Sequence, residues 1–287
     1  MKTRGLLLCV LVLGCSHTQV PLPTLAPSAT NDASASRGEY IVRTVAVCGG
    51  CHAADAKNPA SPLSGGREFR DWRIGVARAS NLTSDPETGL GNWSEAEIVR
   101  ALRNGVRKDG RLLAPVMPYE WFHEMSDSDA LAVARYLRSL PPVRNEVKQS
   151  PNFVFKLGRA LFLHPLSGTN VPEPANRGAY LTQHVGLCAD CHTQRTGLLQ
   201  KADKNRLFGG MTKPPKDFPV KPPNITPDPT RGIGKWSEAD FEKAMRTGVR
   251  PDGRKLNPFM PWPAFAKLTD EDLHAMWEYL RTVKPVH

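Results

Sequence analysis

The sequence predicts an all-α protein built from two similar domains. The chain repeats itself, its apolar residues recur at helical spacing, and no stretch of any length alternates between apolar and polar residues as a β-strand does. Hydrophobic residues make up 40% of the 287 residues and charged residues 23%, which is typical of a soluble globular protein. The 26 prolines predict long loops between the helices.

Residues 1–14 have the anatomy of an export signal. Lys2 and Arg4 precede a short apolar run, Leu6–Leu13, which is too short to span a bilayer as a helix. The run ends in VLGC, which resembles the lipobox of bacterial lipoproteins, and by that resemblance Cys15 would be the acylated first residue of the mature chain. Plain cleavage to a soluble periplasmic form is the alternative. We therefore expect an exported, periplasmic protein that a lipid on Cys15 anchors to a membrane.

Residues 15–36 are rich in Pro, Ala, Ser and Thr and offer little apolar surface to bury, so we expect a flexible tether. No second apolar segment of membrane length follows. Of the six cysteines, Cys9 leaves with the signal, Cys15 is the lipidation candidate, and the other four lie in two short motifs. No cysteine is left for a disulfide outside those motifs, which favours a cofactor.

Each half of the chain contains the same unit. The segment RGEYIVRTVAVCGGCH at 37–52 matches RGAYLTQHVGLCADCH at 177–192, and residues 81–111 are identical to residues 224–254 at 18 of 31 positions without a gap. Two further matching segments follow in the same order in both halves. The predicted domains are 37–143 and 177–287, joined by a Pro-rich linker at 144–176.

Helices can be placed within each repeat. Ser94 and Ser237 each precede an acidic residue by three positions, which resembles a capping box and marks a helix start. The last segment of each repeat carries apolar residues at helical spacing, which predicts one buried stripe per helix. The residues of these stripes are Ala130, Val133, Ala134, Leu137 and Leu140, and Leu273, Met276, Trp277, Leu280 and Val283.

Each repeat contains one Cys-x-x-Cys-His motif, CGGCH in the first and CADCH in the second. This spacing is the attachment signature of c-type haem, because two thiols one helical turn apart can each add to a vinyl group of one porphyrin. The histidine that follows can donate an imidazole nitrogen to iron. We therefore predict two covalently bound c-type haems. The predicted residues are Cys48, Cys51 and His52 for one haem and Cys188, Cys191 and His192 for the other.

Two other chemistries use paired cysteines. Structural zinc needs four ligands at close spacing, so the two pairs, about 140 residues apart, would have to meet around one ion. A thioredoxin-like site needs a βαβ context that the sequence lacks. Both are weaker hypotheses than haem.

One methionine in each repeat stands in the same setting, Met117 in APVMP and Met260 in NPFMP, and no other methionine is shared by the repeats. A thioether is a soft ligand for low-spin haem iron, and His/Met ligation raises the reduction potential. The flanking prolines would stiffen the loop that holds the sulfur. We predict that Met117 and Met260 are the second axial ligands.

The repeat resembles a class I c-type cytochrome domain on these motifs. The run NITPDP…GIG.WSE…GVRPDGR…P.MPW is similar to the cytochrome c subunits of bacterial membrane-bound dehydrogenases for alcohols and gluconate, and the resemblance covers residues 37–143 and 177–286. It implies that the first helix of each domain crosses the last one, with a glycine, Gly38 or Gly178, at the crossing. It also implies that four residues lie near the haems, although a turn or core role is equally open for them. These are Asn81, Trp93, Asn224 and Trp236.

The resemblance implies a carrier of single electrons between a periplasmic or membrane-bound dehydrogenase and the respiratory chain, where a quinone, a cytochrome or a terminal oxidase accepts them. It implies no catalytic residue and no substrate pocket. Those subunits usually carry three haem domains and this chain has two, which leaves the donor open. The alternative is an enzyme, a dihaem peroxidase or an oxidase of small inorganic sulfur compounds, but such an enzyme needs an open iron and both halves keep P-x-M-P.

The formal net charge of +10 is concentrated in the second half, much of it at 201–221. This stretch contains Lys201, Lys204, Lys213 and Lys216. It is either a solvated basic face or a docking patch that steers an acidic redox partner toward the second haem. Nucleic acid is not an expected partner of an exported haem protein.

Overall fold

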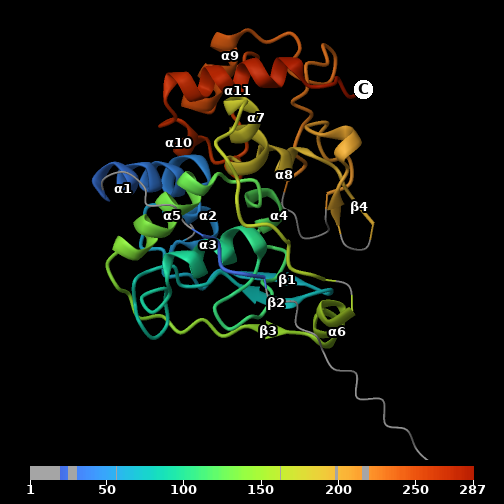
Figure 1. The fold of residues 1–287 in the computed structure, drawn as a ribbon. Coiled ribbons are helices and arrows are strands. Elements are labelled where there is room, and N and C mark those ends of the chain that lie inside the picture. The colour runs from blue at the N-terminus through green and yellow to red at the C-terminus, as the bar shows by residue number, and fades with distance from the viewer. Residues whose placement is uncertain (1–19, 25–30, 56, 162, 198–199, 215–219) are drawn as a thin grey trace, which may run out of the picture.

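The computed structural model describes residues 20–24, 31–55, 57–161, 163–197, 200–214 and 220–287 (Figure 1). The predicted signal at 1–14, the lipidation candidate Cys15 and Lys216 lie outside the described residues. No helix of the described part is both long enough and apolar enough to cross a membrane.

The two halves of the chain contain the same helices in the same order. The first half has α1 (Asn31–Tyr40), a π-helical turn η1 (Ile41–Val45), α2 (Gly49–His52), α3 (Glu95–Asn104), α4 (Tyr119–Phe122) and α5 (Asp127–Ser139). The second half has α7 (Arg177–Ala179), the π-helical turn η2 (Tyr180–Val185), α8 (Cys188–His192), α9 (Glu238–Thr247), α10 (Trp262–Phe265) and α11 (Asp270–Thr282). A short 3₁₀ turn, η3 (Lys204–Arg206), has no counterpart among the described elements of the first half.

The predicted capping boxes are confirmed at the start of α3 and α9. The Ser94 hydroxyl accepts a hydrogen bond from the backbone N–H of Glu97, and the Glu97 carboxylate accepts one from the backbone N–H of Ser94. Ser237 and Asp240 make the same pair of bonds. Both helices end at a glycine with positive φ, so start and stop signals agree in the two halves.

The first and last helices of each half cross at a glycine, as the resemblance implied. A Cβ on Gly38 would lie 2.1 Å from the Ala132 carbonyl oxygen, and one on Gly178 would lie 2.0 Å from the Ala275 carbonyl oxygen. Only glycine therefore allows α1 to contact α5, and α7 to contact α11, this closely. The predicted apolar stripes of α5 and α11 are buried, apart from Val283, which is half-buried.

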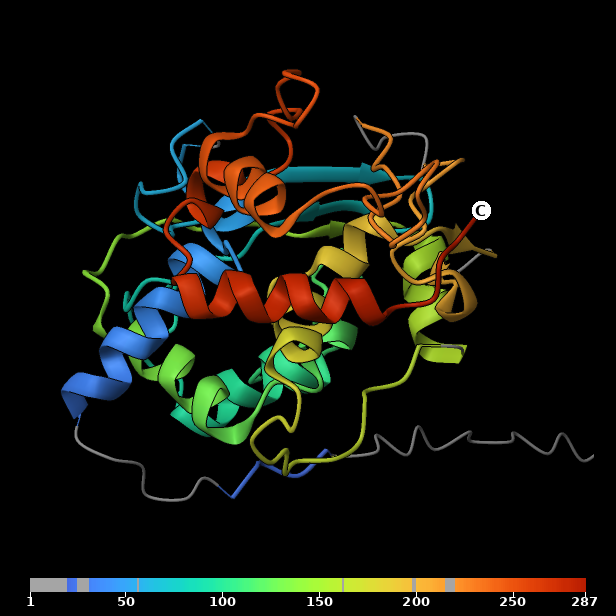
Figure 2. The ribbon, with the colours of Figure 1, turned by 90° about the horizontal axis from the view of Figure 1, so that it is seen from above.

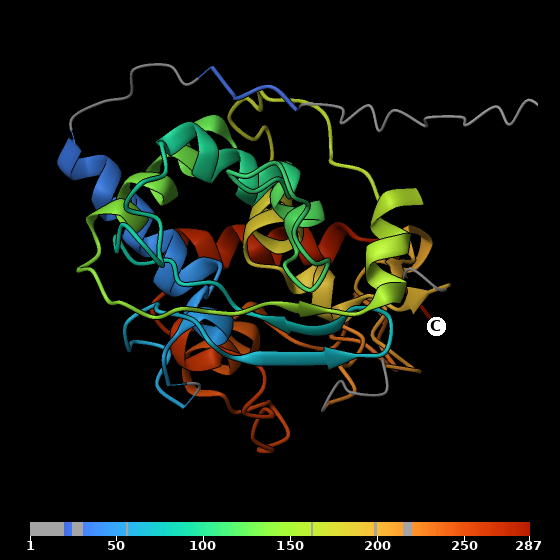
Figure 3. The same cartoon turned by 90° about the horizontal axis from the view of Figure 1, so that it is seen from below.

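The all-α prediction needs a correction, because the described residues also form two small antiparallel sheets. β1 (Glu68–Asp71) pairs with β2 (Gly75–Arg78), and β2 pairs with β3 (Ser150–Pro151); β4 (Arg195–Thr196) pairs with β5 (Lys201–Ala202). In Figure 3 the strands β1, β2 and β3 lie side by side. Strands of two to four residues carry too little alternation for sequence periodicity to detect them.

The segment between the halves packs mainly on the first half. It supplies β3 and the helix α6 (Phe153–Leu161), which stands at the end of the sheet (Figures 1 and 3). The Asn145 side chain donates to the Ser64 carbonyl at 2.9 Å, and the Asn104 side chain donates to the carbonyls of Leu166 and Gly168 at 2.8 Å. Side-chain amides thus fix this segment to the first half at both of its ends.

The tether prediction is wrong at two places within 15–36. Helix α1 begins at Asn31, six residues before the predicted domain boundary. Val20 is 7% exposed and packs in a small cluster with Val106 and Leu112. Composition alone could not reveal this, because a single apolar side chain that is buried does not change the polar character of the stretch.

The two halves share one hydrophobic core. A single cluster of buried side chains runs from Ile41 and Val45 in the first half to Leu181 and Leu280 in the second. The helix α4 of the first half contacts η2 of the second, and α10 of the second half contacts η1 of the first. Figure 2 shows α11 lying over the second half with helices of the first half beneath it. The halves therefore exchange equivalent contacts across their boundary.

Candidate functional site

The two Cys-x-x-Cys-His motifs occupy the same structural position. Each forms a helical turn directly after a π-helical turn, and the backbone N–H of Cys48 bonds to the Val42 carbonyl at 2.9 Å. The residue before each first cysteine, Val47 or Leu187, has a left-handed backbone with φ of 47° or 57°. Branched or bulky residues adopt this conformation at a cost, and such strain gathers at functional sites. No sequence signal announced it.

The motif cysteines are free thiols rather than a disulfide. Burial raises the pKa of Cys48 and of Cys188 to about 12. In the described parts of the chain, no three His, Cys, Asp or Glu side chains are grouped closely enough to hold a metal ion.

The two motif histidines are held in one orientation. His52 Nδ1 lies 2.8 Å from the Ser80 carbonyl oxygen, and His192 Nδ1 lies 2.8 Å from the Pro223 carbonyl oxygen. A carbonyl oxygen only accepts hydrogen bonds, so Nδ1 carries the proton and Nε2 keeps its lone pair. Burial also lowers the pKa of both imidazoles, which favours the neutral form that binds metals.

The methionine loops have the same conformation in both halves. Met117 N–H bonds to the Ala114 carbonyl at 3.0 Å and Met260 N–H bonds to the Asn257 carbonyl at 2.9 Å. The prolines that follow have nearly identical φ and ψ, −81° and 47° for Pro118 and −80° and 44° for the second one. Both methionine side chains are partly buried and pack against the hydrophobic core. Their role as iron ligands stays a prediction.

Two arginines that the sequence analysis did not single out lie in equivalent loops after α3 and α9. The Nε atoms of Arg107 and Arg250 are buried and lack a hydrogen-bond partner among the described residues. Asp109 lies 3.6 Å from Arg107 Nε, too far for a hydrogen bond. Each guanidinium forms an ion pair with an aspartate two residues on, Asp109 or Asp252, and its buried Nε atom can still donate to a further acceptor. The sequence could have indicated these arginines, because the segments GVR and DGR are identical in the two repeats.

The asparagines that the resemblance placed near the haems have a structural role in the fold. The Asn81 amide donates to the Val143 carbonyl at 2.8 Å, and the Asn224 amide donates to the Val286 carbonyl at 2.6 Å. Each therefore ties its loop to the end of its half. Trp93 lies under the Arg107 guanidinium, whose carbon is 6.0 Å from the ring centre.

The donor set of each half fits a c-type haem. One helical turn provides two thiols and an imidazole whose Nε2 is unprotonated. The methionine loop provides a thioether. The loop after α3 or α9 provides a buried guanidinium nitrogen. The carboxylates of haem propionates are the kind of anion that such a nitrogen would bind.

The two motifs lie close to each other across the boundary between the halves. Burial raises the pKa of Cys191 to about 12, and Asp190, Cys188 and, from the first motif, Cys51 add to the rise. The Trp121 indole N–H, from the first half, donates to the Asp190 carboxylate at 2.6 Å. A residue of one half therefore holds the attachment motif of the other.

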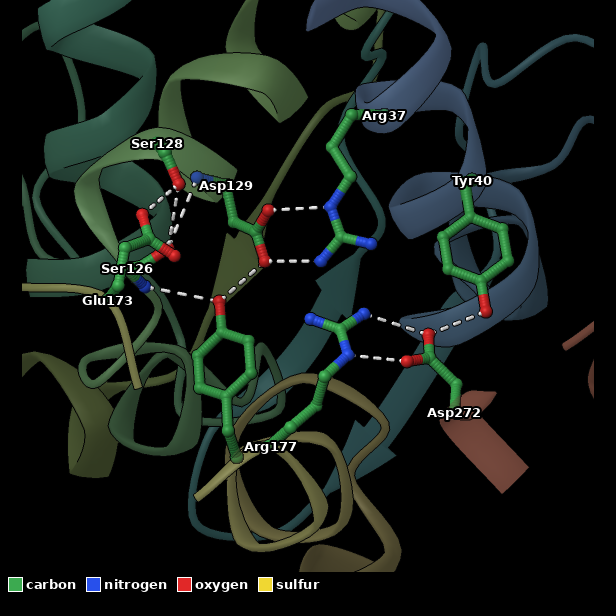
Figure 4. A network of polar contacts seen from close by, with 9 residues as sticks. Arg37, Tyr40, Ser126, Ser128, Asp129, Glu173, Arg177 and Asp272 are labelled. Carbon is green, nitrogen blue, oxygen red and sulfur yellow. Dashed lines mark hydrogen bonds and ion pairs between the residues drawn. The ribbon is translucent and has the colours of Figure 1, made fainter. Parts of the chain in front are cut away.

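Two matching clusters of charged and hydroxyl groups join the halves (Figure 4). Arg37 makes two hydrogen bonds of 2.8 Å to Asp129, and Arg177 forms the equivalent paired contact with Asp272. The tyrosines are exchanged: Tyr40 donates to Asp272 and Tyr180 donates to Asp129, both at 2.8 Å. Each carboxylate thus binds an arginine of its own half and a tyrosine of the other.

A basic groove of about 350 Å³ opens on the second half, next to the carbonyl of Pro223 that holds His192. Its lining includes Arg206, Lys221, Arg231 and His287. Lys201, Lys204 and Lys213 of the predicted docking patch are exposed to solvent, and they lie close to the groove residues along the chain. The described part of 201–221 therefore presents positive charge to solvent beside the second motif.

Comparison with known proteins adds the family context. Residues 175–284 match the family model described as cytochrome c. The chain is 32% identical over 280 residues to the alcohol dehydrogenase (quinone) cytochrome c subunit of Gluconacetobacter polyoxogenes, covering 89% of this chain and 57% of that protein. It is 28% identical over 288 residues to the fructose dehydrogenase cytochrome subunit of Gluconobacter japonicus, covering 96% of this chain and 57% of the relative.

A third relative is similar to this chain over nearly its own length. It is the diheme cytochrome c-type protein of Cereibacter sphaeroides, 29% identical over 266 residues, with 88% of this chain and 86% of the relative covered. By contrast, the chain spans a little over half the length of the dehydrogenase subunits named above.

Proposed function

The chain belongs to the cytochrome c family, and on this premise we propose that it is a dihaem electron carrier. Each half, 37–143 and 177–287, would be a cytochrome c domain with one covalent haem, joined by the segment 144–176. When bound, c-type haem supplies an iron that takes up and releases one electron as it cycles between the ferric and ferrous states.

The observation that carries the proposal is the equivalence and proximity of the two motifs. Both histidines donate Nδ1–H to a carbonyl oxygen at 2.8 Å, and both methionine loops have the same backbone angles. Trp121, in the helix after the first methionine loop, donates to Asp190 of the second motif at 2.6 Å. Two like redox sites that adjoin each other suit the passage of electrons through the molecule in series.

The residues that would hold the haems are those of the two motifs and the two loops. Cys48 and Cys51, with their counterparts Cys188 and Cys191, would form the thioether bonds. His52 and Met117 would be the axial ligands of the first iron, and His192 and Met260 those of the second. Arg107 and Arg250, whose Nε atoms are buried without an acceptor, would bind propionates.

A carrier explains the site better than an enzyme. A dihaem peroxidase or an oxidase of inorganic sulfur compounds needs one iron with an open or displaceable position, and hence a difference between the two ligand loops. Here the loops around Met117 and Met260 share their hydrogen bonds and their proline angles. The enzyme alternative therefore has no support.

The donor in this proposal is a dehydrogenase and the acceptor is a component of the respiratory chain. Relatives that are named as cytochrome subunits of alcohol, fructose and gluconate dehydrogenases support the first part. The exported location and the lipid on Cys15 rest on the N-terminal sequence. The exposed lysines at 201–221 and the basic groove beside them would guide an acidic redox partner to the second haem.

A potentiometric titration of the purified haem-loaded protein tests the proposal. We expect two one-electron waves at positive potential, with both haems low-spin and methionine-bound throughout. If one haem becomes high-spin when its neighbour is reduced, the protein is a dihaem peroxidase and not an electron carrier. A preparation without haem, despite expression with the haem-attachment machinery, would refute both.

A charge-reversal variant tests the docking patch separately. Lys201→Glu with Lys204→Glu should slow electron exchange with an acidic redox protein at low salt and weaken the dependence of the rate on salt. The paired change Lys156→Glu with Lys148→Glu, on the first half, is the control and should leave this rate unchanged. Equal rates for both variants would show that the patch is only a solvated face.

A further inference from the structure

The first half exposes an apolar patch that neither haem site uses. Trp72, in the turn between β1 and β2, is 69% exposed, and Phe153 at the start of α6 is 75% exposed. Val154 and Leu157 of α6 are 48% and 45% exposed. These four are a majority of the seven large apolar side chains that are exposed in the described residues. We name Trp72, Phe153, Val154 and Leu157 the α6 patch.

The α6 patch is a built surface, because its two parts are tied by hydrogen bonds. The Asn152 side chain donates to the Trp72 carbonyl at 2.6 Å, and the Asn152 backbone N–H donates to the Ile74 carbonyl at 3.2 Å. The same side chain accepts from the Phe155 backbone N–H at 2.8 Å and so caps α6. Phe155 is 7% exposed and faces the interior, so α6 is amphipathic.

The segments that form the patch carry a net positive charge. Residues 66–80 and 144–158, which form the sheet and most of α6, contain seven basic and three acidic side chains, and five of the basic ones form ion pairs. Lys156 of α6 is exposed between Val154 and Leu157. A helix with aromatic and aliphatic residues on one face and basic residues beside them is the usual form of an interfacial membrane helix.

The packing of Val20 leaves the predicted lipid anchor within reach of the same region. Val20 packs with Val106 and Leu112, and Leu163 packs against this cluster. The Leu163 N–H bonds to the Gly158 carbonyl of α6 at 3.0 Å, so the cluster adjoins the end of that helix. Cys15 precedes Val20 by five residues, which can span at most about 18 Å.

We infer that the α6 patch docks on the surface of an anionic phospholipid bilayer. The inference rests on the proposed lipidation of Cys15, because an acyl chain there would hold the membrane within a short distance of α6. The aromatic and aliphatic side chains insert at the level of the headgroups, and the basic side chains face the lipid phosphates. The two haem domains are thereby given a fixed orientation on the membrane.

Vesicle binding by haem-loaded protein without an acyl chain tests the inference. The protein is exported with an ordinary cleavable signal and carries Cys15→Ser, so that only the folded surface can bind. Vesicles of phosphatidylglycerol and phosphatidylethanolamine should sediment with it, and vesicles of phosphatidylcholine alone should bind it much more weakly. Phe153→Ser with Leu157→Ser should reduce binding to the anionic vesicles about tenfold.

The chain offers a matched control. Leu22 is 47% exposed, close to the 45% of Leu157, and lies outside the patch. The single variant Leu157→Ser should weaken vesicle binding more than Leu22→Ser does. Hydrogen exchange should in addition slow at residues 68–78 and 150–158 when vesicles are present, and not at 201–214.

Three outcomes would overturn the inference: no binding of the non-acylated protein to anionic vesicles, equal losses in Leu22→Ser and Leu157→Ser, or protection of the patch by a dehydrogenase but not by vesicles. The last result would assign the surface to a protein partner. The potentiometric titration of the same preparation is independent of these results, so a failed carrier function and a failed docking surface are distinguishable.

Discussion

The two halves of the molecule are alike where they would hold haem and differ where they contact their surroundings. Histidine orientation, methionine loops, helix caps and arginines with a buried Nε atom all recur. The three-stranded sheet and α6 belong to the first half, and Trp121, which binds Asp190, has Ala264 as its counterpart. Cofactor chemistry constrains the shared features, whereas contacts between the halves and with partners are free to diverge.

Of the changes that test the likeness of the two halves, removal of one pair of cysteines should have the largest effect. Cys48→Ser with Cys51→Ser, or Cys188→Ser with Cys191→Ser, should each leave one covalent haem per chain instead of two. The haem content is measured from the alkaline pyridine spectrum against protein concentration. Two haems in either variant would contradict the equivalence of the motifs.

The helix crossings should respond equally in the two halves. Gly38→Ala and Gly178→Ala each place a methyl group about 2 Å from a carbonyl oxygen, so each should lower the free energy of unfolding by about 3 kcal/mol. Denaturant titration of the haem-loaded protein measures this. Gly158→Ala, where an added Cβ meets nothing within 4 Å, is the control and should cost nothing.

The exchanged tyrosines should differ in their contribution to stability. Tyr180 is 4% exposed, and its hydroxyl donates to Asp129 and accepts from the Ser126 N–H, so Tyr180→Phe should cost about 2 kcal/mol. Tyr40 is half-buried, and Tyr40→Phe should cost about 1 kcal/mol. Denaturant unfolding measures both losses. If the two variants lose the same free energy of unfolding, the greater burial of Tyr180 does not make its hydrogen bonds more stabilising than those of Tyr40.

The bond between Trp121 and Asp190 should affect the second haem alone. Trp121→Phe removes the indole N–H and should destabilise the fold by about 1 kcal/mol while shifting only the second reduction potential. Trp72→Phe, at an exposed position, is the matched control and should shift neither potential. Shifts of both waves in Trp121→Phe would mean that the halves respond as one unit.

The smallest expected effect is on the stability of the fold at acid pH. Hydrogen bonds from the side chain and backbone of Thr88 lower the pKa of Asp85, and backbone N–H groups at Thr230 and Arg231 lower the pKa of Asp228, helped by His287. A depressed folded pKa stabilises the fold above the unfolded value of about 4, and that stability is lost as pH falls through the folded value. Asp85→Asn and Asp228→Asn should therefore each flatten the fall in unfolding free energy below about pH 4. An unchanged acid profile would contradict this.

Local patterns in the sequence predicted the repeat and the ends and crossings of its helices. The capping boxes, the buried stripes of α5 and α11 and the glycine crossings at Gly38 and Gly178 are all present in the structure. The histidines of both motifs have a free Nε2, as metal ligation requires. Short-range spacing determines these features, because each depends on residues within one helix or on a pair of helices that the repeat itself identifies.

Other features could not be predicted from such patterns. The short strands lack detectable alternation, the left-handed Val47 and Leu187 carry no signal, and Val20 packs in a buried cluster although most of the residues around it are polar or proline. Composition assigned 31–36 to a tether, yet α1 begins at Asn31. In each case a tertiary contact outweighs a weak local preference.

The sequence by itself determined that this protein has two equivalent halves, each with the thiols, imidazole and thioether that a c-type haem needs. Only the tertiary structure decided that Trp121 of the first half binds Asp190 in the second motif, that Tyr40 and Asp272 meet across 232 positions, and that α6 is left exposed. The reason is that spacing along a chain records which residues share a turn or a helix face. How two such units pack depends on the shape and charge of their whole surfaces.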